Sequence, residues 1–293
     1  MDNILSSRAM LAGVKISIWS ARKLDKKVTA ETNQSHGASA DAGRYNKALL
    51  ATDALSKIVA ASSAARAYHY ERTLPWLDDG ARILPALAYE TYATKLREIR
   101  ADFDSAVRAF VADYPGFVAD ARARLNGMFN AEDYPSADQI AAKFGFDVRI
   151  LPVPDARDFR VDIGDAQGAE IRREVEKATR EALDRATRDA WERITAVVGA
   201  MVEKLNAYKP AKRQGDKVEG IFRDSLVSNI RDLVAILPTL NLTGDPKLTA
   251  IVDAMDRELC NVTADELRTD DTLRTATAQA AAAILEEVSQ FLA

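Results

Sequence analysis

The sequence predicts a mostly α-helical fold: an elongated helical bundle with a long coiled-coil-like helical hairpin and a small β-hairpin or three-stranded β-element. Residues 166–208 contain no proline and, beyond Gly168 near the start, one interior glycine, Gly199, so they should form one helix of roughly 42 residues, on the order of 60 Å long. Alanine is abundant and glycine is rare, with 13 glycines in 293 residues, and this composition favours helices. Alternating apolar and polar residues over 11–19 predict a short strand.

Two helices are expected next along the chain. Residues 22–34 are polar and predict a helix, and the small, polar residues 35–43 predict a loop. Residues 45–70 predict a longer helix with Val59 among its apolar residues. The run of small residues over 60–67 would let another helix approach this one closely.

Prolines and glycines divide the following region. From Pro85, apolar residues including Leu87 recur every three to five residues, which predicts a strongly amphipathic helix. The Asp-Tyr-Pro-Gly segment 113–116 should end it, and residues 117–125 should form a further short helix. Ser136 should begin another short helix.

A small β-element is predicted between the two helical halves of the chain. Residues 146–151 and 159–163 are rich in β-forming residues, and the Pro-Val-Pro-Asp linker between them suggests a hairpin. Because a hairpin alone is marginally stable, the strand at 11–19 should join it or helices should cover it.

The long helix 166–208 has a narrow apolar seam between two solvated flanks. The flanks carry acids four residues before bases, such as Glu176 with Arg180, an arrangement typical of solvent-exposed helix surfaces. A break over 209–217 and a second helix over 221–237 predict a helical hairpin with its tip in the break. The seam residues expected to contact a partner helix are Ile171, Val175, Ile194, Val197 and Met201.

Two more helices should complete the chain. The first should start at Asp245-Pro246, and the second should be capped by Asp270 or Asp271 and run to Phe291. The apolar face of the first consists of Leu248, Ile251, Val252, Met255 and Leu259. The predicted organisation is an N-terminal strand and helical region (1–135), a small β-element (136–165), the long helical hairpin (166–237) and C-terminal helices packing on the core (238–293), either as separate regions or as one domain.

Composition and charge limit the function classes. The net charge of −4, from 44 acidic and 40 basic residues, gives no global attraction to nucleic acid or to an anionic membrane. A single cysteine, Cys260, excludes an internal disulfide and, with only two histidines, offers no plausible metal cluster. The first residues lack the pattern of a signal peptide, and no window approaches 18 uninterrupted apolar residues. We therefore expect a cytoplasmic protein with no membrane partner.

Residues that often carry chemistry have simpler structural interpretations here. His69 lies between two tyrosines, and we interpret this cluster as an aromatic patch at a helix end rather than an acid–base group. The acidic pairs 78–79 and 270–271 are typical of helix caps and turns rather than of cation ligands. We interpret Cys260 as a small core residue. Because nucleotide-binding, zinc-protease and serine-hydrolase motifs are also absent, the sequence predicts no catalytic residue, no metal site and no cofactor.

A basic segment at the predicted hairpin tip is a candidate for nucleic-acid contact. Its cations could bind a phosphate backbone while an adjacent tyrosine stacks on a base. The simpler interpretation, a solvated hairpin tip, is favoured because four positive charges in an acidic protein bind weakly at physiological salt. The residues concerned are Tyr208, Lys209, Lys212, Arg213 and Lys217.

Several short sequence motifs occur together along the chain. They are Ile18-Trp19-Ser20-Ala21-Arg22-Lys23, Asp133-Tyr134-Pro135, Phe222-Arg223-Asp224-Ser225, Asn229-Ile230 and Leu237-Pro238-Thr239-Leu240-Asn241. With this set the chain resembles, over most of its length, a family of uncharacterised proteins carried by bacteriophages and mobile elements. The resemblance implies a phage-type protein in a bacterial host cell, often encoded near a MoxR-like AAA ATPase and a protein with a von Willebrand A domain. It brings no assigned catalytic residues with it.

Three functions remain open from the sequence. The leading one is a non-enzymatic helical interaction or scaffold protein that forms oligomers. Its partner would be a second copy of the chain or another phage or host protein, and it could act as an adaptor for an AAA ATPase machine. The alternative is a single-stranded nucleic-acid binding or annealing protein of phage recombination. The third is an enzyme assembled from scattered acids and His69. The narrow seam and the missing catalytic motifs favour the first.

Overall fold

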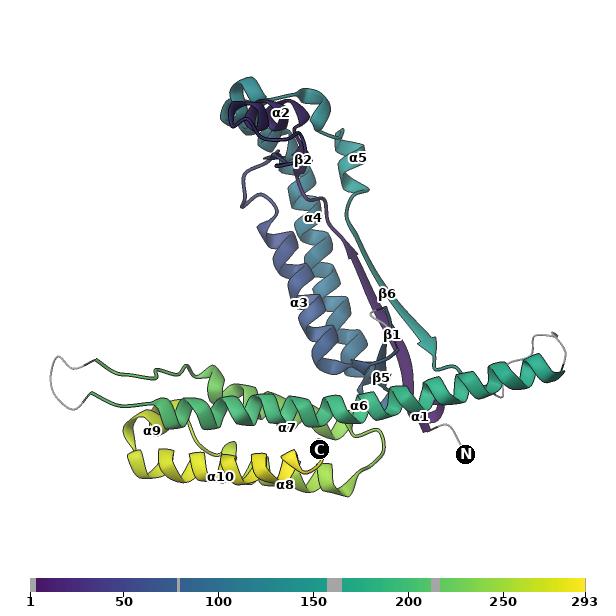
Figure 1. The fold of residues 1–293 in the computed structure, drawn as a ribbon, viewed down its shortest axis with the longest axis vertical. Helices are drawn as coiled ribbons and strands as arrows, with labels where there is room; N and C mark the ends of the chain where they lie inside the picture. Colours follow the sequence, from purple (N-terminus) through teal and green to yellow (C-terminus); the bar gives the residue numbers. More distant parts are fainter. Residues whose placement is uncertain (1–3, 78–79, 157–164, 212–216, 293) are drawn as a thin grey trace. The chain divides into compact units, whose positions relative to one another are not determined.

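The computed structural model is mostly helical with a small antiparallel sheet, and it divides into two compact units (Figure 1). It describes residues 4–77, 80–156, 165–211 and 217–292. Unit 1 consists of residues 1–13, 72–90 and 149–293, and unit 2 of residues 14–71 and 91–148. Each unit is therefore assembled from segments that are distant in the sequence.

The elements follow this division. Unit 1 contains α1 (Ile4–Arg8), β4 (Leu74–Pro75), β5 (Arg82–Pro85), η1 (Ala86–Ala88), α6 (Asp165–Ala207), α7 (Ser225–Leu240), α8 (Pro246–Leu259), α9 (Ala264–Thr269) and α10 (Asp271–Ser289). Unit 2 contains β2 (Arg22–Leu24), α2 (Lys26–Ser35), β3 (Asn46–Ala48), η2 (Asn126–Met128), η3 (Ala131–Asp133), α5 (Ala137–Ala141) and nearly all of α3 (Ser56–Arg72) and α4 (Tyr89–Leu125). β1 (Ala9–Ser17) and β6 (Gly145–Pro152) each have residues in both units.

The larger sheet has the strand order β4-β5-β1-β6. Its antiparallel register pairs Ala9 with Pro85 and Ala12 with Arg82, and Leu74 pairs with Ile83. The predicted strand at 11–19 is confirmed as β1, and the predicted strand at 146–151 is confirmed as β6 beside it. The second predicted hairpin strand, 159–163, lies outside the described residues.

Unit 1 is a helical bundle around α6. The predicted long helix is confirmed, and it packs against α10 and α7, while α8 packs against both of these. Small residues at Ala182, Ala186 and Ala190 let neighbouring elements approach, and larger buried side chains follow from Trp191 onward. Because α6 shares its core with α10 as well as α7, the described residues form a bundle rather than a separate coiled-coil hairpin.

Helix caps and apolar faces of the last helices agree with the sequence predictions. Asp245 accepts a hydrogen bond from Lys247 N and caps α8, and Asp270 accepts one from Leu273 N and caps α10. All five residues of the predicted apolar face of α8 are buried. The expected end of α7 before Pro238 is wrong by about one turn, because Pro238 is accommodated within the helix and Asn241 N closes it on Leu237 O.

Unit 2 is built on α3 and α4, which lie side by side (Figure 1). The inward side of α3 consists of Ile58, Ser62, Ala65 and His69, at the spacing of one helical face. His69 Nδ1 lies 2.7 Å from the hydroxyl of Tyr92 on α4, and both side chains are buried. This contact fixes which side of α3 faces the interior.

The predicted break at 113–116 is wrong, because α4 continues through Pro115. Phe110 stacks on Phe117 across the proline with ring centroids 5.6 Å apart, and it also contacts Tyr114. The hydroxyl of Tyr114 donates to Pro135 O at 3.1 Å. Tertiary packing of the aromatic side chains thus outweighs the one backbone hydrogen bond that a proline removes.

Two predicted helices begin later than expected. Residues 22–24 and 46–48 pair as antiparallel strands β2 and β3, so α2 starts only at Lys26 and α3 only at Ser56. Asp25 stops the strand and caps α2 by accepting from Val28 N. The sequence periodicity missed this pairing because it joins segments more than 20 residues apart.

A buried ion cluster holds the β2–β3 pair to the rest of unit 2. Lys47 is 4% exposed, and its Nζ lies 2.7 Å from Asp133, 3.2 Å from Asp25 and 2.8 Å from Met128 O. Lys23 Nζ lies 2.7 Å from the other oxygen of Asp133. Burial alone would raise the pKa of Asp133, but the hydrogen bonds from Lys23 and Lys47 outweigh it and hold that pKa below its ordinary value.

Candidate interaction surface

Helix α3 presents an uncharged face to solvent. The α3 face, as we name it, consists of Val59, Ala60, Ser63, Ala64, Ala67 and Tyr70, all exposed. Val59 is 46% exposed and Tyr70 is 51% exposed. The solvent side of a surface helix normally carries charged residues, and 29% of this chain is charged, so an exposed side without charges is typical of a contact surface.

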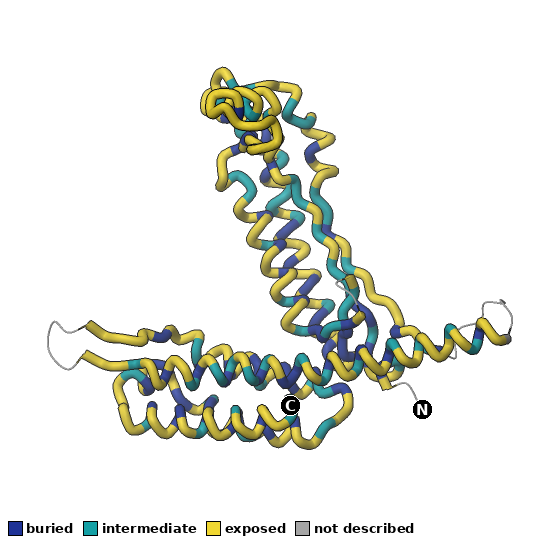
Figure 2. Tube along the Cα trace, viewed as in Figure 1, coloured by how far each residue is buried: buried dark blue, intermediate teal, exposed yellow. Residues whose placement is uncertain are grey.

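The charged residues of α3 lie at the margins of the α3 face. Lys57 precedes it and Glu71 follows it. Arg66 is exposed beside the α3 face, one turn before Tyr70, and its guanidinium donates to Ser62 Oγ and to Ile16 O of β1. Exposed and buried residues alternate along α3 as the helix turns (Figure 2). The small residues in the middle leave room for a second helix to approach closely.

The predicted seam of α6 is divided between the core of unit 1 and a separate half-buried stretch. Ile194 and Met201 are 0% exposed in the core cluster, and Val197 is partly buried against it. These three residues contact the chain's own helices and are not available to another chain. Ile171 and Val175 are half-buried and precede Ala182, where the core cluster begins on α6.

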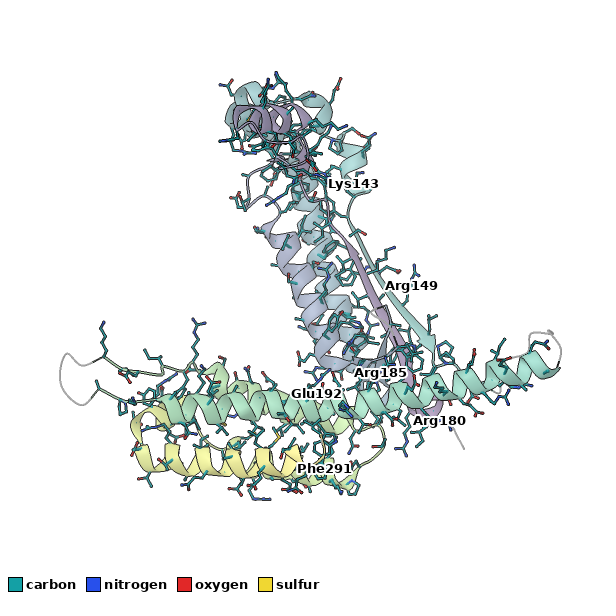
Figure 3. The ribbon with its side chains drawn as sticks, viewed as in Figure 1. Lys143, Arg149, Arg180, Arg185, Glu192 and Phe291 are labelled. Atoms are coloured by element: carbon teal, nitrogen blue, oxygen red, sulfur yellow. The ribbon has the colours of Figure 1, made fainter. Side chains whose placement is uncertain are left out.

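The outer sides of α6 are solvated as predicted. Arg180, Arg185 and Glu192 project from the helix, and Phe291 lies against it (Figure 3). The ring centroid of Phe291 is 4.7 Å from that of Trp191. Glu181 and Arg185 approach within 3.8 Å at exposed positions, a pair of the predicted i, i+4 type.

Lys209, the first cation of the basic segment after α6, is engaged in contacts within the chain. Lys209 and Glu219 exchange both backbone hydrogen bonds, at 3.0 and 3.1 Å, and their side chains form an ion pair at 2.9 Å. Lys217 is exposed, whereas Lys212 and Arg213 lie outside the described residues. The segment re-enters the bundle at Gly220, whose φ of +64° and close approach to Ala207 O leave no space for a Cβ.

Tyr208 is not placed to stack on a base. Its ring is half-buried, packs edge-on against Phe222 with centroids 5.1 Å apart, and has the guanidinium of Arg274 over it at 5.0 Å. The described residues of the segment therefore give no support to single-stranded nucleic-acid binding at this place.

The remaining candidates for chemistry have structural roles where they are described. His69 belongs to the buried contact with Tyr92, and Asp270 is the cap of α10. Cys260 is half-buried against the core, and burial raises the pKa of its thiol. The pair 78–79 lies outside the described residues. Among the described residues, no three of His, Cys, Asp and Glu are grouped as a metal site would require.

One pocket of about 280 Å³ lies between α7 and the start of α9. Its lining includes Arg231 and Thr263, but Arg231 already donates to Cys260 O and Val262 O at 2.9 Å. Thr263 forms a capping box with Glu266. Because these polar groups are satisfied by the fold and the volume falls below that of usual ligand sites, the pocket is not a candidate for substrate binding.

Comparisons with protein-family models, with curated proteins and with solved structures return no match for this chain. Across the described helices, no stretch is both long and apolar enough to cross a membrane. The interpretation of the α3 face consequently depends on the geometry of this chain alone.

Two apolar residues predicted on the apolar faces of helices lie at the surface instead. Val59 was expected on the apolar side of its helix and Leu87 on an amphipathic helix, yet Val59 is exposed and Leu87 is 87% exposed in η1. The sequence signal that could have located the α3 face was the absence of charged residues over 58–65, which covers two full helical turns. Periodicity cannot tell an inner from an outer apolar face when a helix has both.

Proposed function

We propose that this chain is a non-enzymatic interaction protein that binds a partner helix on the α3 face. The observation that carries the proposal is the uncharged, exposed side of α3, bounded by two exposed hydrophobic side chains. From Val59 to Tyr70 it extends about 17 Å along the helix, which is about three turns. An apposed helix of similar length would cover it.

The chemistry of the α3 face indicates a helix as the ligand. Alanine and serine at its centre permit interaxial distances near 8 Å, at the close end of helix packing. Val59 and Tyr70 at the ends would each lose exposed apolar surface on binding, at roughly 25 cal/mol per Å². An adaptor role beside an AAA ATPase, as the resemblance implies, is compatible with such a surface.

Site-specific photocrosslinking tests the proposal in cells that naturally contain the protein. A benzophenone amino acid replaces Ser63 in the full-length chain, and the matched control places it at Ala101, an exposed residue of α4. We expect the Ser63 variant to form one discrete adduct that maps to a helix of the captured chain and disappears when Ala64→Glu is added. Adducts that are identical at the two positions, or insensitive to Ala64→Glu, would contradict the proposal.

A further inference from the structure

We infer that Asn126, in the turn after α4, is a site of spontaneous deamidation, and that the isoaspartate formed there weakens the hold of Lys47 on the β2–β3 pair. The inference concerns unit 2 and does not depend on the α3 face. Asn126 is followed by Gly127, and no other asparagine of the sequence precedes a glycine. Because glycine has no side chain, its backbone nitrogen approaches the preceding carboxamide with the least steric hindrance.

The local structure leaves the reacting groups open. α4 ends at Leu125, and Asn126 has a φ of +45°, the left-handed conformation in which glycine or asparagine ends many helices. Asn126 and Gly127 are both exposed, and beyond the adjacent residues no heavy atom lies within 4 Å of the position that a Cβ on Gly127 would occupy. Within the described part of the chain, no hydrogen bond engages the carboxamide of Asn126. The carboxamide is therefore free to react.

The reaction consumes water and no other reactant. The nitrogen of Gly127 loses its proton to solvent and attacks Cγ of Asn126, which closes a succinimide ring, while the side-chain nitrogen takes up a proton and leaves as ammonia. Water then opens the ring at either carbonyl. The product is aspartate when the Gly127 nitrogen stays bonded to the main-chain carbonyl carbon. It is isoaspartate, with one more methylene in the main chain, when that nitrogen stays bonded to Cγ.

The added methylene lies close to a carbonyl that belongs to the buried ion cluster. Met128 O, two residues after Asn126, accepts a hydrogen bond from Lys47 Nζ at 2.8 Å. The next residue, Phe129, stacks on Tyr134 with ring centroids 5.1 Å apart. Because α4 holds one end of this turn and the stacked rings hold the other, a longer main chain displaces Met128 O and lengthens its bond to Lys47. The new carboxylate also lies at the C-terminal end of α4, where a negative charge is unfavourable.

Peptide mass spectrometry of the full chain, incubated at neutral pH and physiological temperature, tests the site. We expect deamidation at Asn126 to be roughly tenfold faster than at Asn206, which is exposed on α6 and followed by alanine. Gly127→Ala is the matched variant, because there is space for its methyl group and that group should slow the reaction by roughly the same factor. Equal rates at Asn126 and Asn206, or an unchanged rate in Gly127→Ala, would overturn the inference.

Hydrogen exchange of residues 46–48 tests the consequence separately, with electron-transfer fragmentation to distinguish isoaspartate from aspartate. In the wild type, this exchange should become roughly tenfold faster as isoaspartate accumulates. In Asn126→Gly, which suits the left-handed φ and has no carboxamide, it should stay constant over the same incubation. Constant exchange in the wild type while isoaspartate forms, or the same rise in Asn126→Gly, would overturn the link to Lys47.

Discussion

At the residue scale, Lys47 shows how one buried charge organises unit 2. Its ammonium is surrounded by two carboxylates and a backbone carbonyl, and the two carboxylates raise its pKa above the ordinary value although burial alone would lower it. Removing the cation would leave Asp25 without its ion-pair partner, while Asp133 would keep its pair with Lys23. The cluster therefore ties β3 to η3 and to the cap of α2.

We predict that Lys47→Met lowers the stability of this part of unit 2 by about 3 kcal/mol, because the partly buried carboxylate of Asp25 loses its ion-pair partner. Hydrogen exchange measured by mass spectrometry should show residues 46–48 exchanging roughly a hundredfold faster. Lys27→Met is the matched control, since the Lys27 side chain is 85% exposed and its pair with Glu31 is long, at 3.9 Å. Unchanged exchange in Lys47→Met would show that the cluster does not hold the strand pair.

Several residues of the motifs quoted for the phage-family resemblance have structural roles at this scale. Lys23 and Asp133 form an ion pair, and Tyr134 donates to Leu49 O at 2.8 Å. Asn241 donates to Asp245 O and accepts from Asp245 N, which holds the turn between α7 and α8. These positions explain the fold of each unit rather than a reaction.

At the scale of elements, local signals predicted the helices and nonlocal contacts decided the exceptions. The bounds of α6 and α8 follow from periodicity and from caps adjacent in the sequence, such as Asp245. The late start of α3 results from the pairing of β2 with β3, and the continuity of α4 results from contacts of its aromatic residues with later segments, Tyr114 with Pro135 O and Phe110 with Phe144. Neither interaction is visible in a short sequence window.

The candidate surface was predictable only in part for the same reason. The run of small residues over 60–67 is enough by itself to indicate a place for close helix contact. Which side of α3 is free depends on His69 contacting Tyr92, a contact between helices that the sequence does not specify. The seam of α6 was recognised as a helix contact, but its main partners, α10 and α7, belong to the same chain.

We predict that the two parts of the α6 seam differ in their effect on folding. Ile194→Ala should lower the free energy of unfolding by about 3 kcal/mol, because it opens a cavity in the core of unit 1. Val175→Ala, at a half-buried position outside the core cluster, should lower it by less than about 1 kcal/mol. Urea unfolding followed by circular dichroism measures both, and equal losses would contradict the division of the seam.

At the scale of the whole molecule, the two units differ in the surfaces that their helices leave exposed. Unit 1 buries the apolar residues of α6 from Ala182 to Leu205 within its own bundle, whereas unit 2 leaves one side of α3 uncharged and exposed. A protein with such a surface should associate through it, and a single charge introduced there should prevent association because the charge would lose its hydration on binding.

Light scattering coupled to size-exclusion chromatography tests this central claim most directly. Purified from cells that naturally contain it, the wild-type protein should elute with its partner, at a mass above that of one 32.1 kDa chain. Ala64→Glu should remain at the mass of one chain, while Ala101→Glu, exposed on α4, should behave as wild type. A wild-type protein that stays at the mass of one chain, or a complex that Ala64→Glu does not disturb, would contradict the account.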